Sequence, residues 1–256
     1  QCVRVALAAP EFRYDWTRVR DALTPRTRLI IFNNPLNPSC TVAGAQDLQV
    51  LTELTREREI YVLADEVYEH VVFDGRRHHS VLSVPELAAR SFAVFSFGKT
   101  LHATGLRIGY CVAPRELTRE LRKVHQFNTF SVTSPLQYAI AQFLIERDGS
   151  WNALAAFFQG KRDALLSALS GSGFRARPAE GTYFQLIDFA ELSDETDAAF
   201  AERLISDAGV ATIPLSPFYR AGAPRSLIRV CLAKRDETLR AAVERLLEFA
   251  RRQRAA

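Results

Sequence analysis

The sequence has no methionine, begins with Gln1, and contains only four lysines among its 33 basic residues. No stretch approaches the roughly 18 consecutive apolar residues that a membrane-spanning helix needs. No basic cluster followed by a long apolar run marks a signal peptide. We therefore expect no membrane partner. Because Gln1 does not look like a translation start, we also expect the chain to be part of a longer protein.

Cysteine is scarce as well. The four cysteines, Cys2, Cys40, Cys111 and Cys231, lie far apart in the sequence and form no Cys-x-x-Cys pair. This pattern provides neither a zinc framework nor a disulfide scaffold. We therefore expect no metal site and a reducing, cytoplasmic location.

No large excess of one charge is present. The formal net charge is +4 over 256 residues, and the arginines are scattered, with their densest run at 251–254. A nucleic-acid binder usually concentrates its basic residues on one face, so we expect no nucleic-acid partner. With 48% hydrophobic and 24% charged residues, the composition is that of an ordinary globular protein.

The sequence does contain an alternation of short β-rich runs and helical stretches. The apolar runs are mostly continuous, which is typical of a sheet covered on both faces. Strand followed by helix, repeated, predicts an α/β fold with a mainly parallel sheet over residues 1–150. The expected strands span 4–7, 29–32, 60–64, 91–95 and 107–112, and the expected helices span 43–58, 115–127 and 135–146.

The organisation changes after Gly149. Residues 151–256 contain fewer strands, which indicates a smaller C-terminal α+β domain. Its expected strands span 181–187, 210–213 and 227–232, and its expected helices span 151–169, 197–207 and 236–252.

Polar residues follow the expected strands of the first sheet, where ligands bind in open α/β folds. Asn34 and Asn37 lie in a loop with two Asn-Pro steps, which enforce an extended path. By itself this segment favours a plain loop over a binding site. Asp65 and Glu66 end the next strand, either as acidic residues at a helix N-terminus or as an anion required inside a site.

A lysine follows the fourth strand, in the segment from Ser96 to Lys99. A lysine at such a position has little room to reach solvent, and its ready change of pKa suits imine formation with a carbonyl. The alternative is a solvated lysine in a turn. In the segment 104–109 that follows, the glycines allow close backbone approach, and Arg107 offers a planar fork for a phosphate.

Taken in order, these motifs resemble the class I pyridoxal-phosphate aminotransferases of fold type I. They are Asn-Pro-x-Asn-Pro, Asp-x-x-Tyr, Ser-x-x-Lys and Thr-Gly-x-Arg-x-Gly, followed by residues 227–231 (LIRVC), which match the family's substrate-arginine strand. Segments 181–184, 213–219 and 123–126 are similar to the branch of methionine and kynurenine aminotransferases. The resemblance implies a PLP-binding large domain over 1–150, a small domain over 151–256, and a homodimer.

The resemblance also implies catalytic roles. Lys99 would hold pyridoxal 5′-phosphate as an internal aldimine, and its amine would then move a proton between the substrate and the cofactor. Asp65 would pair with the pyridine nitrogen, which makes the ring an electron sink. Tyr68 and Asn37 would hydrogen-bond the 3′-oxygen of the ring.

Further binding roles follow from the same resemblance. Ser96 and Arg107 would bind the cofactor phosphate. Arg229, together with Asn37, would bind the substrate, and its guanidinium would clamp the α-carboxylate. The implied activity moves an amino group between an L-amino acid (methionine, aromatic or otherwise hydrophobic) and a 2-oxo acid.

The sequence departs from the family pattern in two places. Cys40 stands where the family has glycine, so a positive φ there would cost energy, and we expect a tolerated loop variant. The family's N-terminal stretch, with its glycine-rich phosphate loop and stacking ring, is absent. We therefore expect the chain to begin partway into the large domain and to bind cofactor weakly by itself.

Two other functions stay open. A PLP-dependent C–S β-lyase on the same fold would use Lys99 and Arg229 equally. A PLP-sensing domain of a transcription regulator is the second, although the C-terminal similarity argues against it.

Two short patterns favour ordinary structure over binding. Residues 171–176 match G-x-G-x-x-A but follow an expected helix, which favours a C-cap turn over a dinucleotide site. His70, His78 and His79 flank the Asp74-Gly75 turn and are expected in a solvated loop.

Overall fold

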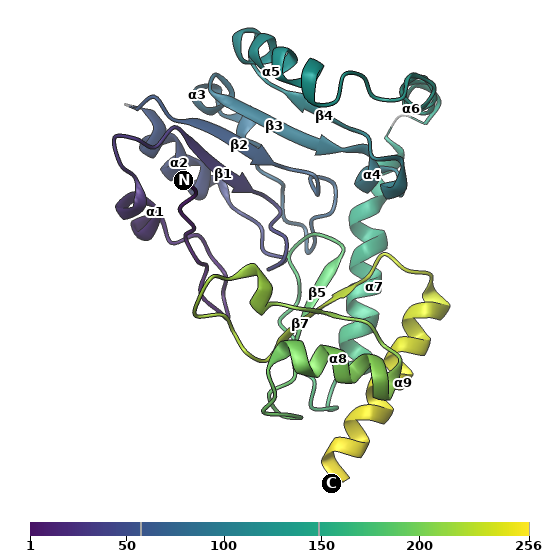
Figure 1. The fold of residues 1–256 in the computed structure, drawn as a ribbon. Helices are drawn as coiled ribbons and strands as arrows, with labels where there is room; N and C mark the ends of the chain where they lie inside the picture. Colours follow the sequence, from purple (N-terminus) through teal and green to yellow (C-terminus); the bar gives the residue numbers. More distant parts are fainter. Residues whose placement is uncertain (57, 148, 256) are drawn as a thin grey trace.

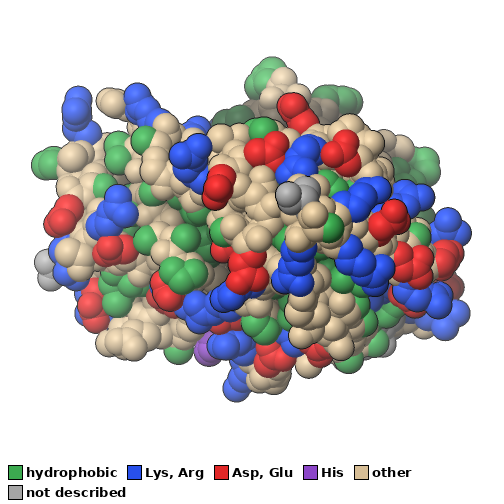
Figure 2. Space-filling view, turned by 90° about the horizontal axis from the view of Figure 1, so that it is seen from below, with side chains coloured by type: hydrophobic (Ala, Val, Ile, Leu, Met, Phe, Trp, Pro, Cys, Tyr) green, Lys and Arg blue, Asp and Glu red, His purple; other side chains and the backbone are tan. Residues whose placement is uncertain are grey.

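The computed structural model describes residues 1–56, 58–147 and 149–255. Figure 1 shows two sheets in separate parts of the molecule, with the long helices α7 and α9 beside the second sheet. No helix among the described residues is long and apolar enough to cross a membrane. On the face shown in Figure 2, basic side chains are interspersed with acidic ones rather than gathered in one patch.

The first sheet has four strands in the order β1-β2-β3-β4. The strands β1, β2 and β3 pair in parallel, and β4 pairs antiparallel with β3, so the predicted mainly parallel α/β sheet is confirmed. Their bounds are Leu29–Asn33 (β1), Tyr61–Asp65 (β2), Ser91–Ser96 (β3) and Gly109–Val112 (β4).

The expected strand at 4–7 is wrong. Residues 4–7 form no ladder with another strand, and a strand needs such a partner for its backbone groups. Side chains from elsewhere bind two of their carbonyls instead. Arg18 donates to the carbonyl of Ala6 at 3.2 Å, and Tyr219 donates to that of Leu7 at 2.8 Å.

Nine α-helices are described in these residue ranges. Their bounds are Trp16–Ala22 (α1), Ala45–Arg56 (α2), Pro85–Ala88 (α3), Phe97–Thr100 (α4), Arg115–Asn128 (α5), Ser134–Glu146 (α6), Leu154–Leu169 (α7), Asp197–Ala208 (α8) and Asp236–Ala255 (α9). The predicted helices agree with these to within a few residues, except that residues 150–153 form a 3-10 turn before α7, and that position 57 lies outside the described residues.

The first sheet is covered on one face among the described residues, which corrects the prediction of two covered faces. Leu48 and Leu51 of α2 pack with Phe32 and Val62 on the covered face. On the other face, the side chain of Ile31 is 64% exposed. Since successive side chains point to opposite faces, Asn33 and Asp65 lie on the same open face as Ile31.

The second sheet comprises β5 (Phe184–Asp188), β7 (Leu227–Cys231) and β6 (Ile213–Pro214), in that order and all antiparallel. Strands occur near all three predicted places, but β5 begins three residues later than expected, and β6 shares only Ile213 with the strand expected at 210–213. Thr182 has a φ of 69°, a left-handed conformation that cannot continue a strand. The sheet packs with α7, α8 and α9 around Phe158, Phe200 and Phe249.

Candidate active site

A cavity of about 420 Å³ opens at the carboxyl ends of β1, β2 and β3. This is where open α/β folds bind ligands. All six residues that the sequence predicted to bind cofactor line it, namely Asn37, Asp65, Tyr68, Ser96, Lys99 and Arg107. The structure therefore brings together side chains that lie up to 70 residues apart in the sequence.

The loop after β1 is fixed to the end of β2 by asparagine side chains. Asn33 donates from Nδ2 to the carbonyl of Asp65 at 2.8 Å, and its Oδ1 accepts from the backbone N–H of Asn37 at 2.9 Å. Asn34 is fully buried and bonds the carbonyl of His79 and the N–H of Ala43. Asn34 thus shapes the loop, while Asn37 reaches the cavity.

Asp65 and Lys99 face this cavity from β2 and α4. Burial raises the pKa of the Asp65 carboxyl, while the N–H of Val67 and the positive charge of Lys99 oppose this rise. Lys99 lies in the short helix α4, directly after β3, and is half-buried. A carboxylate and an amine are therefore held together in a pocket that partly excludes water.

Two glycines allow the backbone to close around the cavity. A Cβ at Gly109 would lie 2.3 Å from the carbonyl oxygen of Phe95, and one at Gly98 would lie 3.0 Å from the Cα of Thr104. Larger residues do not fit at either position without a backbone shift. The prediction of close approach is confirmed at Gly109 but wrong at Gly105, where a Cβ would meet no atom within 4 Å.

Arg107 has a φ of 55°, which is unusual for a residue other than glycine. Its Nη1 donates to the carbonyl of Thr104 at 3.2 Å, which leaves further N–H groups for a ligand. Ser96, at the end of β3, lines the same cavity. A hydroxyl and a guanidinium in one cavity form a set of donors that suits a phosphate.

Tyr68 is 3% exposed and packs edge-on against Tyr183, with ring centroids 5.1 Å apart. Burial is the main cause that raises the pKa of its phenol, and Tyr183 adds to this effect. Tyr68 is therefore a neutral donor near neutral pH.

Arg229 reaches the loop of the first sheet from β7 of the second sheet. Its guanidinium donates a hydrogen bond to Oδ1 of Asn37 and lies 4.0 Å from the ring centroid of Phe184. Phe218 lies on the same guanidinium at 5.5 Å. The Nε of Arg229 is buried without a partner among the described residues. An arginine held against aromatic rings, with an unused donor, is suited to binding a carboxylate.

Cys40 has a φ of 63° at the position where the sequence departs from the family pattern. The side chain is 1% exposed, and burial raises the pKa of its thiol to about 12. The left-handed conformation is thus kept without glycine, and the thiol is unreactive.

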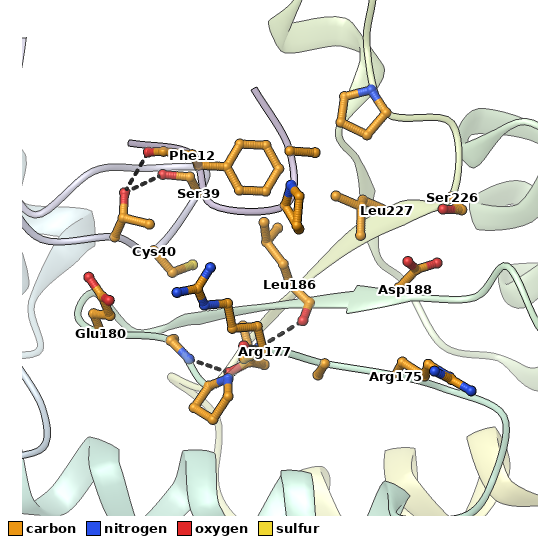
Figure 3. Close-up of a pocket in the computed structure, with 18 residues that line it drawn as sticks. Phe12, Ser39, Cys40, Arg175, Arg177, Glu180, Leu186, Asp188, Ser226 and Leu227 are labelled. Atoms are coloured by element: carbon orange, nitrogen blue, oxygen red, sulfur yellow. Dashed lines mark hydrogen bonds between the residues drawn. The ribbon is translucent and has the colours of Figure 1, made fainter. Parts of the chain in front are cut away.

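Figure 3 shows a second cavity of about 420 Å³, on the side of the loop where Cys40 and Glu180 lie. Glu180 binds the loop through the N–H of Val42 at 3.0 Å and pairs with Arg13. None of the residues predicted to bind cofactor or substrate lines this cavity.

The short glycine pattern behaves as predicted. Gly171 and Gly173 follow the end of α7 at Leu169 with φ of 72° and 95°, so they form a turn after a helix.

The solvated-loop prediction is wrong for His78. Its side chain is 12% exposed and contacts the buried carboxylate of Glu66. Among the described residues, no group of His, Cys, Asp and Glu is arranged to hold a metal ion.

Sequence reasoning missed four residues of this region. Asn33 lines the cavity, Tyr183 packs on Tyr68, and Phe184 and Phe218 hold Arg229. The position of Asn33 could have been found, because it ends a strand that pairs with the strand ending at Asp65. The aromatic contacts depend on how the two sheets pack, which no local pattern reports.

A model of the family described as aminotransferase class I and II matches residues 1–246. The chain is 47% identical to a methionine aminotransferase of Escherichia coli over 96% of this chain and 64% of that relative. It is 32% identical to a kynurenine–oxoglutarate transaminase of Dictyostelium discoideum, over 89% of this chain and 58% of that protein.

A solved structure from Escherichia coli, for which a methionine aminotransferase function is described, superposes with a TM-score of 0.93. It shares 47% identity and is matched over 96% of this chain and 65% of that one. The chain thus spans less than two thirds of the length of these relatives.

Proposed function

Because the chain belongs to the class I and II aminotransferase family, we propose that its protein transfers an amino group between an L-amino acid and a 2-oxo acid with pyridoxal 5′-phosphate. The observation that carries this proposal is the shared cavity of Lys99 and Asp65, which Arg229 approaches through Asn37. The similarity to named aminotransferases does not favour a C–S lyase or a regulatory domain.

The residues of the cavity fit the cofactor. Asp65 offers a carboxylate to a pyridine nitrogen, Lys99 an amine to an aldehyde, and Ser96 and Arg107 offer donors to a phosphate. When bound, the cofactor supplies an electron sink that stabilises the carbanion left when the substrate loses its α-proton. A half-buried Asp65 beside Lys99 supports this role, since a carboxylate inside a cavity needs a cationic partner.

We assign proton transfer at the substrate α-carbon to the amine of Lys99. Arg229 orients the substrate by bidentate hydrogen bonds to its α-carboxylate, and Phe184 and Phe218 hold the guanidinium plane. Tyr68 donates a hydrogen bond to the cofactor from a buried phenol.

We propose methionine, aromatic or other hydrophobic amino acids as the donors, since relatives are named methionine and kynurenine aminotransferases. We further propose a homodimer in the cytoplasm, with a PLP-binding domain over 1–150 and a small domain over 151–256. The free cysteines, of which Cys40 is buried, support a reducing location.

A transamination panel on the intact protein tests the function. Methionine, an aromatic amino acid and aspartate serve as donors, with several 2-oxo acids as acceptors. Cofactor-dependent conversion of an acceptor into its amino acid supports the proposal, and faster reaction with aspartate would contradict the substrate class. Release of a thiol, ammonia and a 2-oxo acid from a sulfur amino acid would indicate a lyase instead.

A further inference from the structure

Glu66 and His78 form a buried contact on the face of the sheet opposite to Asp65. Successive side chains at a strand end point to opposite faces, so Asp65 faces the cavity while Glu66 faces the packed interior. The Glu66 side chain is fully buried. Its carboxylate accepts hydrogen bonds from Nε2 of His78 and from the N–H of Val81, both at 2.9 Å.

The negative charge of Glu66 affects the ionisation of its neighbour Asp65 at the same strand end. Burial is the main cause that raises the pKa of Asp65, and the negative charge of Glu66 raises it further. A buried carboxylate also costs free energy unless a positive or hydrogen-bonding partner compensates it. The imidazole of His78 lies 2.9 Å from this carboxylate and is such a partner, since its ring nitrogen can donate a hydrogen bond and the ring can carry a positive charge.

His78 is not explained by stability alone. Its Nδ1 is buried and has no hydrogen-bond partner among the described residues, which costs free energy that an apolar side chain would not. The surrounding titratable groups are Glu66, Glu69, His70 and Tyr110. Glu69 accepts from the Tyr110 hydroxyl at 3.3 Å, and its carboxylate lies 3.4 Å from Nε2 of His70.

The segment that carries His78 also contacts the loop beside Asp65. The carbonyl of His79 accepts from Nδ2 of Asn34 at 3.1 Å, and the N–H of Asn34 donates to the carbonyl of Asp65 at 3.0 Å. The segment therefore touches both neighbours of Asp65, namely Glu66 in the chain and Asn34 in the adjacent loop.

We propose that His78 is a positioning residue for the cofactor site. By donating to Glu66 and compensating its charge, it leaves Asp65 as the carboxylate that faces the ring nitrogen of a bound cofactor. This inference rests on the proposed function and extends it to the opposite face of the sheet.

The test measures the dissociation constant of pyridoxal 5′-phosphate and the visible absorption of the bound cofactor from pH 6 to pH 9. The variants are His78→Gln, Glu66→Gln with His78→Gln, and the neighbouring control His79→Gln. His79 takes part in the hydrogen bonds described above through its backbone carbonyl, which the substitution His79→Gln keeps. Each measured value is divided by the value for the unsubstituted protein at the same pH, so that the titration of the cofactor itself cancels.

In H78Q, the negative charge of Glu66 lacks its partner and favours a protonated Asp65, an effect that is largest at the lower pH values, where Asp65 is still partly protonated. We expect the affinity ratio to be lowered roughly tenfold at the lower end of the range and to recover as the pH rises, and the absorption titration to move with it. The second substitution, E66Q, removes the uncompensated charge. The double variant is therefore expected to bind within a few-fold of the unsubstituted protein at every pH.

A merely structural role predicts a different pattern. In that case the double variant binds no better than H78Q, or the ratio for H78Q is independent of pH, and either result overturns the inference. If H78Q does not fold, the single variant E66Q tests the inference. A tenfold loss of affinity on removing the Glu66 charge would then contradict the inference. If the unsubstituted protein binds no cofactor, the proposed function itself fails.

Discussion

The guanidinium of Arg229 donates a hydrogen bond to the Asn37 side chain, which is 192 residues away in the sequence. This contact joins β7 of the second sheet to the loop after β1 of the first. Because Asn37 lines the cavity that also contains Lys99, the contact brings Arg229 to the residues that form this cavity. The two halves of the candidate site are thus coupled through one side chain.

Replacement of Arg229 by alanine is expected to raise KM for amino acids and to lower kcat. The guanidinium both binds the carboxylate and orients the substrate, so kcat/KM should fall roughly 100-fold, the worth of about 3 kcal/mol of charge-assisted hydrogen bonding. Arg229→Lys should recover part of the loss, since it keeps the charge but not the planar fork. The exposed Arg235 provides the matched control, R235A. An unchanged kcat/KM in R229A would contradict the assignment.

Borohydride reduction of the protein with bound cofactor should label Lys99 and no other lysine. Among the described residues, Lys99 is the only lysine that lines the cavity, whereas Lys123 pairs with Glu120 on exposed α5. Peptide mass mapping gives the labelled position. K99A should lose the label and K123A should keep it. A label on Lys123, Lys161 or Lys234 would overturn the role of Lys99.

Cys40→Gly should be more stable than Cys40→Ala, by about 1 kcal/mol in the free energy of unfolding. Glycine is ordinarily the less stable of the two, but a φ of 63° costs any residue with a Cβ roughly this amount. Urea unfolding of both variants measures the difference. Gly149, which has a φ of 73°, offers a comparison site, where G149A is expected to destabilise the protein. A less stable C40G would show that strain at this position is not significant.

Glu69 should make the protein less stable as the pH rises towards neutrality. Burial is the main cause that raises the pKa of Glu69 from 4.5 to about 7. A carboxyl with a raised pKa binds a proton in the folded protein where the unfolded chain has lost it. Its contribution is therefore complete below about pH 4.5 and is lost as the pH rises through 7.

The urea midpoint at pH 5 and pH 8 checks this expectation. E69Q should show a smaller decrease between these pH values than the unsubstituted protein. The exposed Glu53, which accepts a hydrogen bond from Gln49 in its own helix, supplies the control variant E53Q. Equal pH dependence of E69Q and the unsubstituted protein would contradict the raised pKa.

Much of the fold could be predicted because its cues are local. The continuous apolar runs at 29–32, 60–64 and 91–95 became the three parallel strands. The carboxyl ends of parallel strands share one edge, so Asp65 and Lys99 could be placed in one site before any coordinates. Ser96 and Arg107 were placed in this site by the resemblance to the family.

Other features depended on the whole chain. Residues 4–7 have an apolar pattern but no neighbouring strand, and a strand needs a partner for its hydrogen bonds. His78 lies in a segment with turn residues, yet packing against the sheet buries it beside Glu66. Neither result follows from the nearby sequence, because each depends on which other segment packs against these residues in the folded chain.

The sequence by itself determined which chemical groups the site contains, since strand ends and motif spacing are properties of nearby residues. Only the tertiary structure decided how those groups meet. Packing of the second sheet brings Arg229 to Asn37 and places its guanidinium against Phe184 and near Phe218. Such contacts join residues far apart in the chain, and their geometry is determined by the packing of the two sheets.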